Sequence, residues 1–188
     1  EKLGYTDKFP RWAMAYKFEA EETTTILKGV TWNVGRTGKL TPLAHLEPVE
    51  LCGATIRKAT LNNYGDILRN KVKIGSRVFI RRSNDVIPEI LGVAEDNDGK
   101  PIVPPEVCPA CGAKLYEDGA HIFCPNEYGC RPQVIGRLEH FTGKECMDIR
   151  GISEKSIAQL YDNLGVRSLI DLYSLTADEL KTLDGFKD

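Results

Sequence analysis

The 188-residue chain is 41% hydrophobic and 28% charged, which is typical of a folded globular protein and excludes a disordered polar chain. No stretch reaches the roughly 20 consecutive apolar residues that a helix needs to cross a bilayer, so we expect no membrane association. The net charge of −2 hides an uneven distribution, because residues 57–82 hold eight basic side chains against Asp66 alone. This block predicts contact with an anionic polymer, although a solvated charged surface is the alternative.

The chain begins with the polar run EKLGYTDKFP, which lacks the apolar segment of a signal peptide. A strand is predicted almost at once, at RWAMAYKFEA (residues 11–20), where large apolar side chains alternate with small ones. Its second face carries two alanines followed by Lys17. Lys17 either extends into water from an exposed face, or contacts a phosphate above a shallow ligand floor. Because the chain opens so close to a strand, we expect a piece of a longer protein.

Short strands separated by turn residues dominate the next section, residues 23–103. Five strands are predicted, at residues 23–34, 40–51, 54–61, 76–82 and 86–95, with a helical turn at YGDILRN. Five short strands over about eighty residues favour a small closed barrel, and the OB-fold is the leading candidate.

Four of the six cysteines fall within 23 residues, after the proline-rich run PIVPPEVCP. Cys108 and Cys111 form a C-x2-C knuckle, and Cys124 and Cys130 supply a second pair. Four thiolates at such spacing predict a closed tetrahedral zinc site over residues 104–132. An iron–sulfur cluster, redox thiols and His121 as a rival ligand are the alternatives.

Helical periodicity begins at residue 133 and continues to residue 188. A tight turn is predicted over Ile149–Ser153, with Ser153 capping the following helix, and TADE is a capping box for another. The backbone N–H groups after Gly151 either contact phosphate, or the two helices form an ordinary packed pair.

The order of these parts resembles the bacterial NAD-dependent DNA ligases over essentially the whole chain. LGYTDKFPRWAMAYKFEA is similar to the last nucleotidyltransferase segment of that family's adenylation domain, and VGRTGKLTPLAHLEPVELCGATIRKATLNN to the start of its OB-fold. RRSNDVIPEI resembles the loop that enters the minor groove, while the four cysteines and MDIRGISEKSI resemble its zinc finger and first helix-hairpin-helix. The implied fold is multidomain, mainly β then α: the end of the adenylation domain (1–22), an OB-fold β-barrel (23–103), a four-cysteine zinc finger (104–132) and a truncated helix-hairpin-helix domain (133–188).

The resemblance also implies a function and site residues. It implies sealing of nicked duplex DNA in replication and repair, with NAD, structural Zn²⁺ and Mg²⁺ as cofactors, by a cytoplasmic, nucleoid-associated monomer. Lys17 would contact the nucleotide phosphate and Arg11 would lie in the same active site; no Mg²⁺ ligand is identified. The implied and predicted DNA contacts are Arg36, Arg57, Lys73, Arg82, Val86, Ile87 and Gly151, with Val86 and Ile87 as an apolar wedge in the minor groove.

Several departures from the family pattern stand out. The nucleophilic lysine of a K-x-D-G motif does not occur in these 188 residues, since KTLDG has one residue too many. We therefore expect this chain alone to be inactive in ligation. Asn62 stands where histidine is common, and RRSND replaces an arginine-alanine-glycine run. The rival class is a non-catalytic OB-fold and zinc-ribbon module that only holds nucleic acid. The four-cysteine unit followed by a hairpin argues against an ATP-dependent ligase or a capping enzyme.

Overall fold

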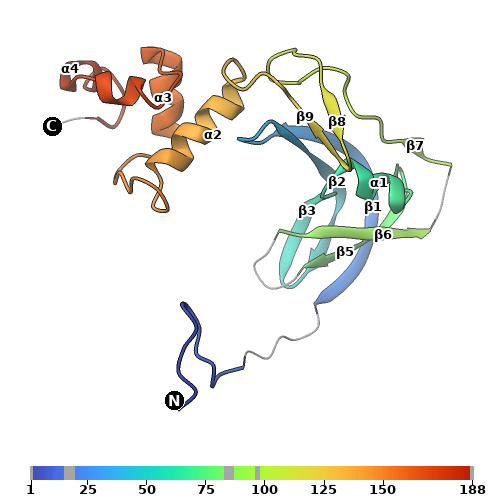
Figure 1. Cartoon of the computed structure of the whole chain (residues 1–188). Coiled ribbons are helices and arrows are strands. Elements are labelled where there is room, and N and C mark those ends of the chain that lie inside the picture. The colour runs from blue at the N-terminus through green and yellow to red at the C-terminus, as the bar shows by residue number, and fades with distance from the viewer. Residues whose placement is uncertain (1, 15–19, 83–86, 96–97, 187–188) are drawn as a thin grey trace.

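The computed structural model describes residues 2–14, 20–82, 87–95 and 98–186 (Figure 1). The predicted barrel is present, and its five main strands match the predicted strands closely. They are β1 (Glu21–Val34), β2 (Lys39–Leu51), β3 (Ala54–Thr60), β5 (Arg77–Arg82) and β6 (Glu89–Glu95). A short helix, α1 (Tyr64–Arg69), and two minor strands, β4 (Lys73–Ile74) and β7 (Lys100–Pro101), complete this part, here called the barrel.

The five strands close on themselves in the order β1-β5-β6-β3-β2, with β1 also paired to β2. All contacts are antiparallel except the parallel pairing of β3 with β6, where Thr60 faces Glu89. Closure satisfies the backbone groups that an open sheet would leave unpaired at its edges. This arrangement is that of an OB-fold barrel.

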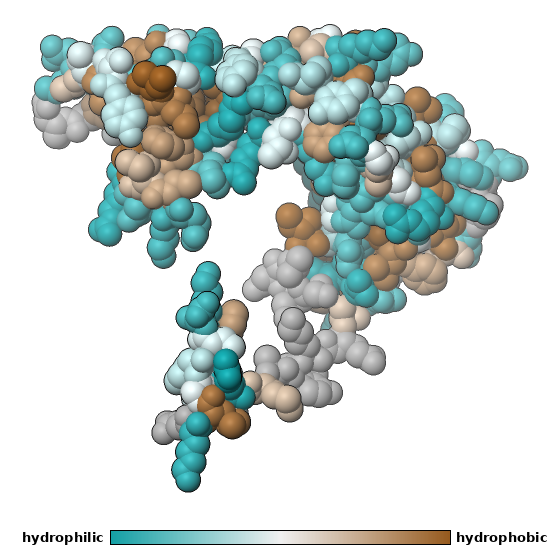
Figure 2. All heavy atoms as spheres, in the orientation of Figure 1, coloured by the Kyte–Doolittle hydropathy of each residue, from teal (hydrophilic) through white to brown (hydrophobic). Residues whose placement is uncertain are grey.

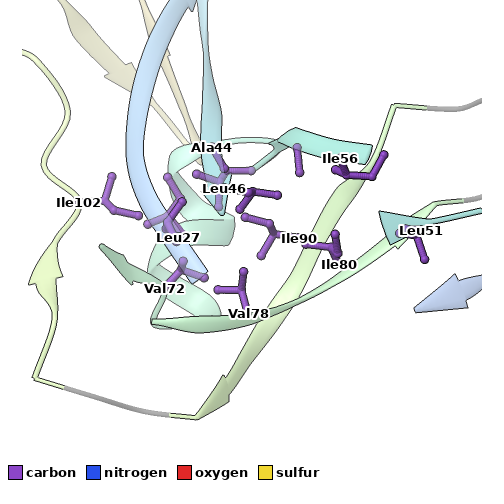
Figure 3. Packing of buried hydrophobic residues seen from close by; sticks show 13 residues of the cluster. Leu27, Ala44, Leu46, Leu51, Ile56, Val72, Val78, Ile80, Ile90 and Ile102 are labelled. Atoms are coloured by element: carbon purple, nitrogen blue, oxygen red, sulfur yellow. The ribbon is translucent and has the colours of Figure 1, made fainter. Parts of the chain in front are cut away.

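Alternating residues of these strands fill the barrel interior. Leu27, Val78 and Ile80 are completely buried, and Figure 3 shows them pointing toward one another with side chains from β2, β3 and β6. Helix α1 closes the barrel with Ile67, and it begins where the side chain of Asn63 accepts a hydrogen bond from the backbone N–H of Asp66. Burying this apolar surface is the main stabilising contribution to the barrel.

The cysteine-rich segment continues the barrel sheet. Strand β9 (His121–Phe123) pairs with β2, where Leu40 faces Ile122, and β8 (Tyr116–Asp118) pairs with β9. Leu40, which is 1% exposed, packs with the cysteines and with half-buried Trp32 of β1. The segment therefore shares a hydrophobic cluster with the barrel, which the sequence pattern did not predict.

The remaining elements form the helical part, residues 131–186, beside the β8–β9 hairpin (Figure 1). They are α2 (Arg131–Thr142), α3 (Glu154–Leu164), a 3-10 helix η1 (Asp171–Ser174) and α4 (Ala177–Leu180). The predicted caps are confirmed, because Ser153 and Thr176 each form a capping box. Helix α2 begins at Arg131 and not at residue 133, since Pro132 favours the first turn of a helix.

The strand predicted over residues 11–20 is wrong for the part of it that the structure describes before residue 15. Arg11 and Trp12 form a turn, followed by irregular chain, and the exposed fractions of Trp12 and Met14 are 45% and 99%. A strand needs a neighbouring strand for its backbone groups and a layer for its apolar face, whereas the described part of this segment only folds back on residues 4–5 of the same N-terminal turn. Lys17 lies outside the described residues.

No helix in the described ranges combines the length and apolar character required to span a bilayer. The longest helix among the described residues, α2, has 12 residues.

Candidate metal centre and nucleic-acid interface

Cys108, Cys111, Cys124 and Cys130 converge on one point, with all four Sγ atoms within 4.8 Å of one another. The Sγ atoms of Cys108 and Cys130 are 3.9 Å apart, and those of Cys111 and Cys124 are 3.5 Å apart. Zinc–sulfur bonds of about 2.3 Å in a tetrahedron place sulfurs about 3.8 Å apart. The four cysteines therefore fit a tetrahedral metal ion of this size.

Each pair of cysteines is positioned by local backbone geometry. In the first knuckle, the N–H of Gly112 donates to the carbonyl of Cys108 at 2.9 Å, and Gly112 adopts φ +73°. This left-handed conformation, which glycine adopts at little cost, folds the chain back toward the sulfurs. Cys124 follows strand β9 directly, and Cys130 is the N-cap residue of α2. Cys130 thus connects the four-cysteine cluster directly to the helical part.

The thiols of this cluster influence one another. Burial acts to raise the pKa of Cys111, but hydrogen bonds from the Ala113 backbone and the Asn126 side chain, together with neighbouring thiols, lower it to about 7. Burial raises the pKa of Cys124, and the other thiols add to that effect. One thiolate therefore forms readily, while further thiolates need a cation to compensate their charge. This is the donor set that a divalent thiophilic metal requires.

His121 does not belong to the four-cysteine cluster. Its Nε2 lies 3.5 Å from Nζ of Lys39, and its Nδ1 is buried without a hydrogen-bond partner among the described residues. The ring also packs edge-on against Phe123. His121 therefore lies on the barrel side of the hairpin.

The basic block of residues 57–82 is not gathered into one cluster. Lys73 lies in β4, before β5, and Arg82 ends β5, which extends roughly 16 Å from Arg77 to Arg82. Arg69 pairs with Asp66 at 2.7 Å, and Arg81 forms a two-pronged contact with Glu89 at 3.1 and 2.7 Å. Much of the block's charge is thus neutralised locally.

Arg57 differs from these paired arginines. It is exposed on β3, and the structure gives it no acidic partner in the ranges described. Arg82 is half-buried at the end of β5, where its backbone pairs with that of Glu21. Within the block, Arg57 consequently offers the more accessible charge.

The loop between β5 and β6 carries the predicted wedge. Ile87 is 69% exposed although it is large and apolar. Val86 lies outside the described residues, so only half of the predicted wedge is seen. The exposed Ile87 side chain is therefore accessible to an apolar partner.

Arg36 lies on the turn between β1 and β2, and this turn contacts helix α2. A Cβ atom added at Gly136 of α2 would lie 2.7 Å from the Cβ of Arg36. Arg36 also borders a hollow of about 480 Å³ together with Gln133, Arg137 and His140. The structure therefore brings Arg36 to the helical part, whereas Arg57 and Arg82 lie on strands β3 and β5 of the barrel.

The predicted hairpin has the expected turn. Gly151 adopts φ +85°, and a Cβ there would meet nothing within 4 Å. Ser153, two residues later, caps α3.

Arg11 is exposed in the N-terminal turn, where its N–H donates to the carbonyl of Gly4 at 2.9 Å. The structure does not bring Arg11 together with the other predicted site residues that it describes.

Sequence reasoning missed two features of this region. Gln133 is 1% exposed and donates to the carbonyl of Cys124 at 3.1 Å, so a polar side chain lies inside the junction. Gly38 packs against the same carbonyl, within 2.4 Å of a hypothetical Cβ. Gly35 and Gly38, three residues apart in GRTG, indicated a turn, but nothing in the pattern indicated what the turn would contact.

Figure 2 shows the exterior of these parts, with hydrophilic side chains bordering the hollow between the helical part and the barrel. Hydrophilic surface of this kind favours a polar partner over an apolar one.

Comparison with known proteins gives the family. Residues 24–101 match the model of the NAD-dependent DNA ligase OB-fold domain. The whole chain is 56% identical to DNA ligase 2 of Clostridium acetobutylicum, and 99% of it is 56% identical to the DNA ligase of Alkaliphilus oremlandii. It is 53% identical over its whole length to the DNA ligase of Finegoldia magna. The chain spans 28–29% of the length of these relatives. Residues 24–101 thus belong to the OB-fold domain family of the NAD-dependent DNA ligases, and the chain as a whole is similar to a segment of bacterial DNA ligases that includes this domain.

Proposed function

We propose that this chain is the DNA-binding segment of an NAD-dependent DNA ligase, which joins a 3′-hydroxyl to a 5′-phosphate at a nick in duplex DNA. The observation that carries the proposal is the 53–56% identity with DNA ligases along essentially the entire chain. A match confined to the barrel would be less informative, since OB-folds bind many ligands. Here the barrel, the four cysteines and the helical part match together.

The barrel supplies two kinds of contact in this proposal. Arg36, Arg57, Lys73 and Arg82 contact phosphates, which positions the duplex without reading its sequence. Ile87, with Val86 beside it, enters the minor groove and favours an opened, distorted helix. The exposure of Ile87 supports this role. Gly151 allows the hairpin turn before α3 to approach a phosphate closely.

Zinc is the metal that we propose for the four cysteines. The spacing of their sulfurs and the all-thiolate donor set support it. A closed shell of four protein ligands leaves no position for substrate, so the ion is structural. It stabilises a segment whose own apolar cluster is small and which depends on the barrel through Leu40.

Lys17 and Arg11 contribute to adenylyl transfer in this proposal. NAD supplies the adenylyl group, and the ammonium of Lys17 neutralises phosphate charge as that group is transferred. Arg11 lies in the same active site. No K-x-D-G lysine occurs in these 188 residues, so the nucleophile belongs to another part of a full-length ligase. The same holds for the ligands of Mg²⁺, none of which is identified here.

We infer that the full-length protein is a cytoplasmic monomer that associates with the nucleoid, and that it acts in replication and repair. Nicks in duplex DNA arise in both processes, and a single polypeptide that surrounds a nick needs no second copy. These inferences rest on the ligase relationship.

Binding to nicked and intact duplex tests the proposal directly. Residues 1–188 are titrated by fluorescence anisotropy against the two duplexes, with the same sequence and length, at several salt concentrations. We expect preferential binding to the nicked duplex and strong salt dependence. Equal binding to single-stranded DNA and both duplexes would instead identify a general nucleic-acid module. Incubation with labelled NAD should leave the chain unlabelled, and stable covalent AMP on it would contradict the proposed assignment.

A further inference from the structure

Gln133 is a buried amide that joins helix α2 to the cysteine-rich segment. Its exposed fraction is 1%, and its Nε2 donates to the carbonyl oxygens of Cys124 at 3.1 Å and Asn126 at 3.4 Å. A buried amide without such partners would destabilise the protein. Its two hydrogen bonds therefore fix the first turn of α2 against the chain that connects the third and fourth cysteines.

The turn between β1 and β2 packs into the same junction. The N–H of Cys124 donates to the carbonyl of Gly38 at 2.8 Å. A Cβ on Gly38 would lie 2.4 Å from the carbonyl oxygen of Cys124 and 3.0 Å from Oε1 of Gln133, and Gly38 has φ +80°. The turn can approach this closely only because residue 38 has no side chain.

One helical turn beyond Gln133, Gly136 makes a second close approach. A Cβ there would lie 2.7 Å from Cβ and 3.2 Å from Cα of Arg36. Gln133 and Gly136 are spaced i, i+3, so they share one face of α2. This face contacts the turn at residue 38 and again at residue 36. The orientation of Arg36 is consequently tied to the orientation of the helix.

We propose that Gln133 is a positioning residue for DNA binding: with Gly38 and Gly136, it locks the Arg36 turn onto α2, so that the barrel and the helical part engage one duplex as a single rigid body. This inference rests on the proposed DNA-binding function. A fixed arrangement lets contacts from both parts form together without an additional ordering cost. Gln133 itself acts only through Arg36 and α2.

Gly136→Ala separates positioning from stability. Alanine is a better helix former than glycine, so a purely structural role predicts an unchanged or more stable helix. The added Cβ must nevertheless displace Arg36. We expect full zinc content and intact α2, with affinity for nicked duplex reduced about tenfold. Gly92→Ala is the matched control, because a Cβ at Gly92 meets nothing within 4 Å.

Gln133→Leu tests the amide itself, since leucine fills a similar volume but cannot donate. Gln159→Leu is its control: Gln159 also bridges two backbone groups, those of Asp184, but within the helical part. Residual dipolar couplings of backbone amides measure the orientation of the barrel relative to the helical part. One alignment tensor should fit both parts in the wild-type chain and in the controls. Separate tensors should be needed for Gln133→Leu and for Gly136→Ala.

A double variant gives the decisive comparison. If the lock positions Arg36, then Arg36→Ala should weaken duplex binding less in the Gly136→Ala background than in the wild type. Equal losses in both backgrounds, a common alignment tensor in Gly136→Ala, or loss of zinc from Gln133→Leu would overturn the inference. The dipolar couplings need no DNA. Failure of the wild-type chain to bind duplex would therefore contradict the proposed function while the couplings still report whether the lock exists.

Discussion

The N–H of Cys124 donates a hydrogen bond to the carbonyl of Gly38 at 2.8 Å, and this bond attaches the four-cysteine cluster to the turn between β1 and β2. Directly before this contact, β9 pairs with β2 and Ile122 covers Leu40. The cysteine-rich segment is thus built onto the barrel sheet. Its loss would uncover barrel surface as well as unfold the segment.

Cys124→Ser should release the metal and unfold residues 104–130. The barrel core should persist, because Leu27, Val78 and Ile80 do not pack against the cysteines. The melting temperature of the barrel should nevertheless fall, because Leu40 becomes exposed. Elemental analysis and hydrogen exchange measure the two effects. Cys52→Ser is the control, since Cys52 is exposed and does not belong to the four-cysteine cluster. Retention of one zinc per chain in Cys124→Ser would contradict the assignment.

Arg57→Ala should weaken binding to every duplex sequence alike. Loss of one phosphate contact releases one fewer counterion, so the slope of log affinity against log salt should fall by about 1. Arg69→Ala should change the slope less, because Asp66 already neutralises Arg69 at 2.7 Å. Anisotropy titrations at several salt concentrations measure both slopes. A larger change for Arg69→Ala than for Arg57→Ala would place the phosphate contacts elsewhere.

Ile87→Ala should behave differently, since it removes apolar surface and no charge. The salt slope should remain the same, while the preference for nicked over intact duplex should fall. The removed surface acts only where the helix is opened, so intact duplex should be bound as before. Leu68→Ala, which truncates another exposed aliphatic side chain of the barrel, is the control. An unchanged nick preference in Ile87→Ala would exclude Ile87 as a wedge.

Asp162→Asn should destabilise the contact between α2 and α3 in a pH-dependent way. The Arg131 guanidinium donates hydrogen bonds of 3.0 and 2.6 Å to the two carboxylate oxygens of Asp162, and it lowers the pKa of Asp162 in the folded protein. The contribution of this ion pair to the free energy of unfolding is therefore fully present above the pKa that an aspartate has in the unfolded chain. It is lost as the pH falls through the lowered pKa of Asp162 in the folded protein. Melting curves should differ by a few degrees at neutral pH and coincide in strong acid. A difference that persists in acid would exclude the ion pair as the cause.

Lys17→Ala in a full-length ligase containing this segment should cripple nick sealing. Loss of a preorganised charge at a transferring phosphate costs about 3 kcal/mol, or roughly a hundredfold in rate. Gel-based ligation of a labelled nick measures it, and Lys17→Arg should recover part of the activity because the charge returns in a different shape. Wild-type turnover by Lys17→Ala would make Lys17 a solvent-exposed side chain without a role.

The sequence by itself determined the local features of this protein. Alternation in TTTILKGVTWNV and SRVFIRR predicted strands, because side chains on a strand alternate between core and solvent. Capping boxes at Ser153 and Thr176 fixed where α3 and α4 begin, since each cap satisfies backbone groups only a few residues away. The C-x2-C knuckle and the second cysteine pair predicted the convergence of four sulfurs, because four thiols at this spacing suit one tetrahedral ion.

Only the tertiary structure decided which of these units contact one another. The strand predicted over residues 11–20 is absent from residues 11–14, because a strand needs a partner that the neighbouring sequence does not specify. The basic block, continuous in sequence, is spread over β3, α1, β4 and β5, and acidic side chains of β6 and α1 neutralise part of its charge. The junction of Gly38, Cys124 and Gln133 joins residues 95 positions apart, and such contacts depend on the packing of whole elements and not on local periodicity.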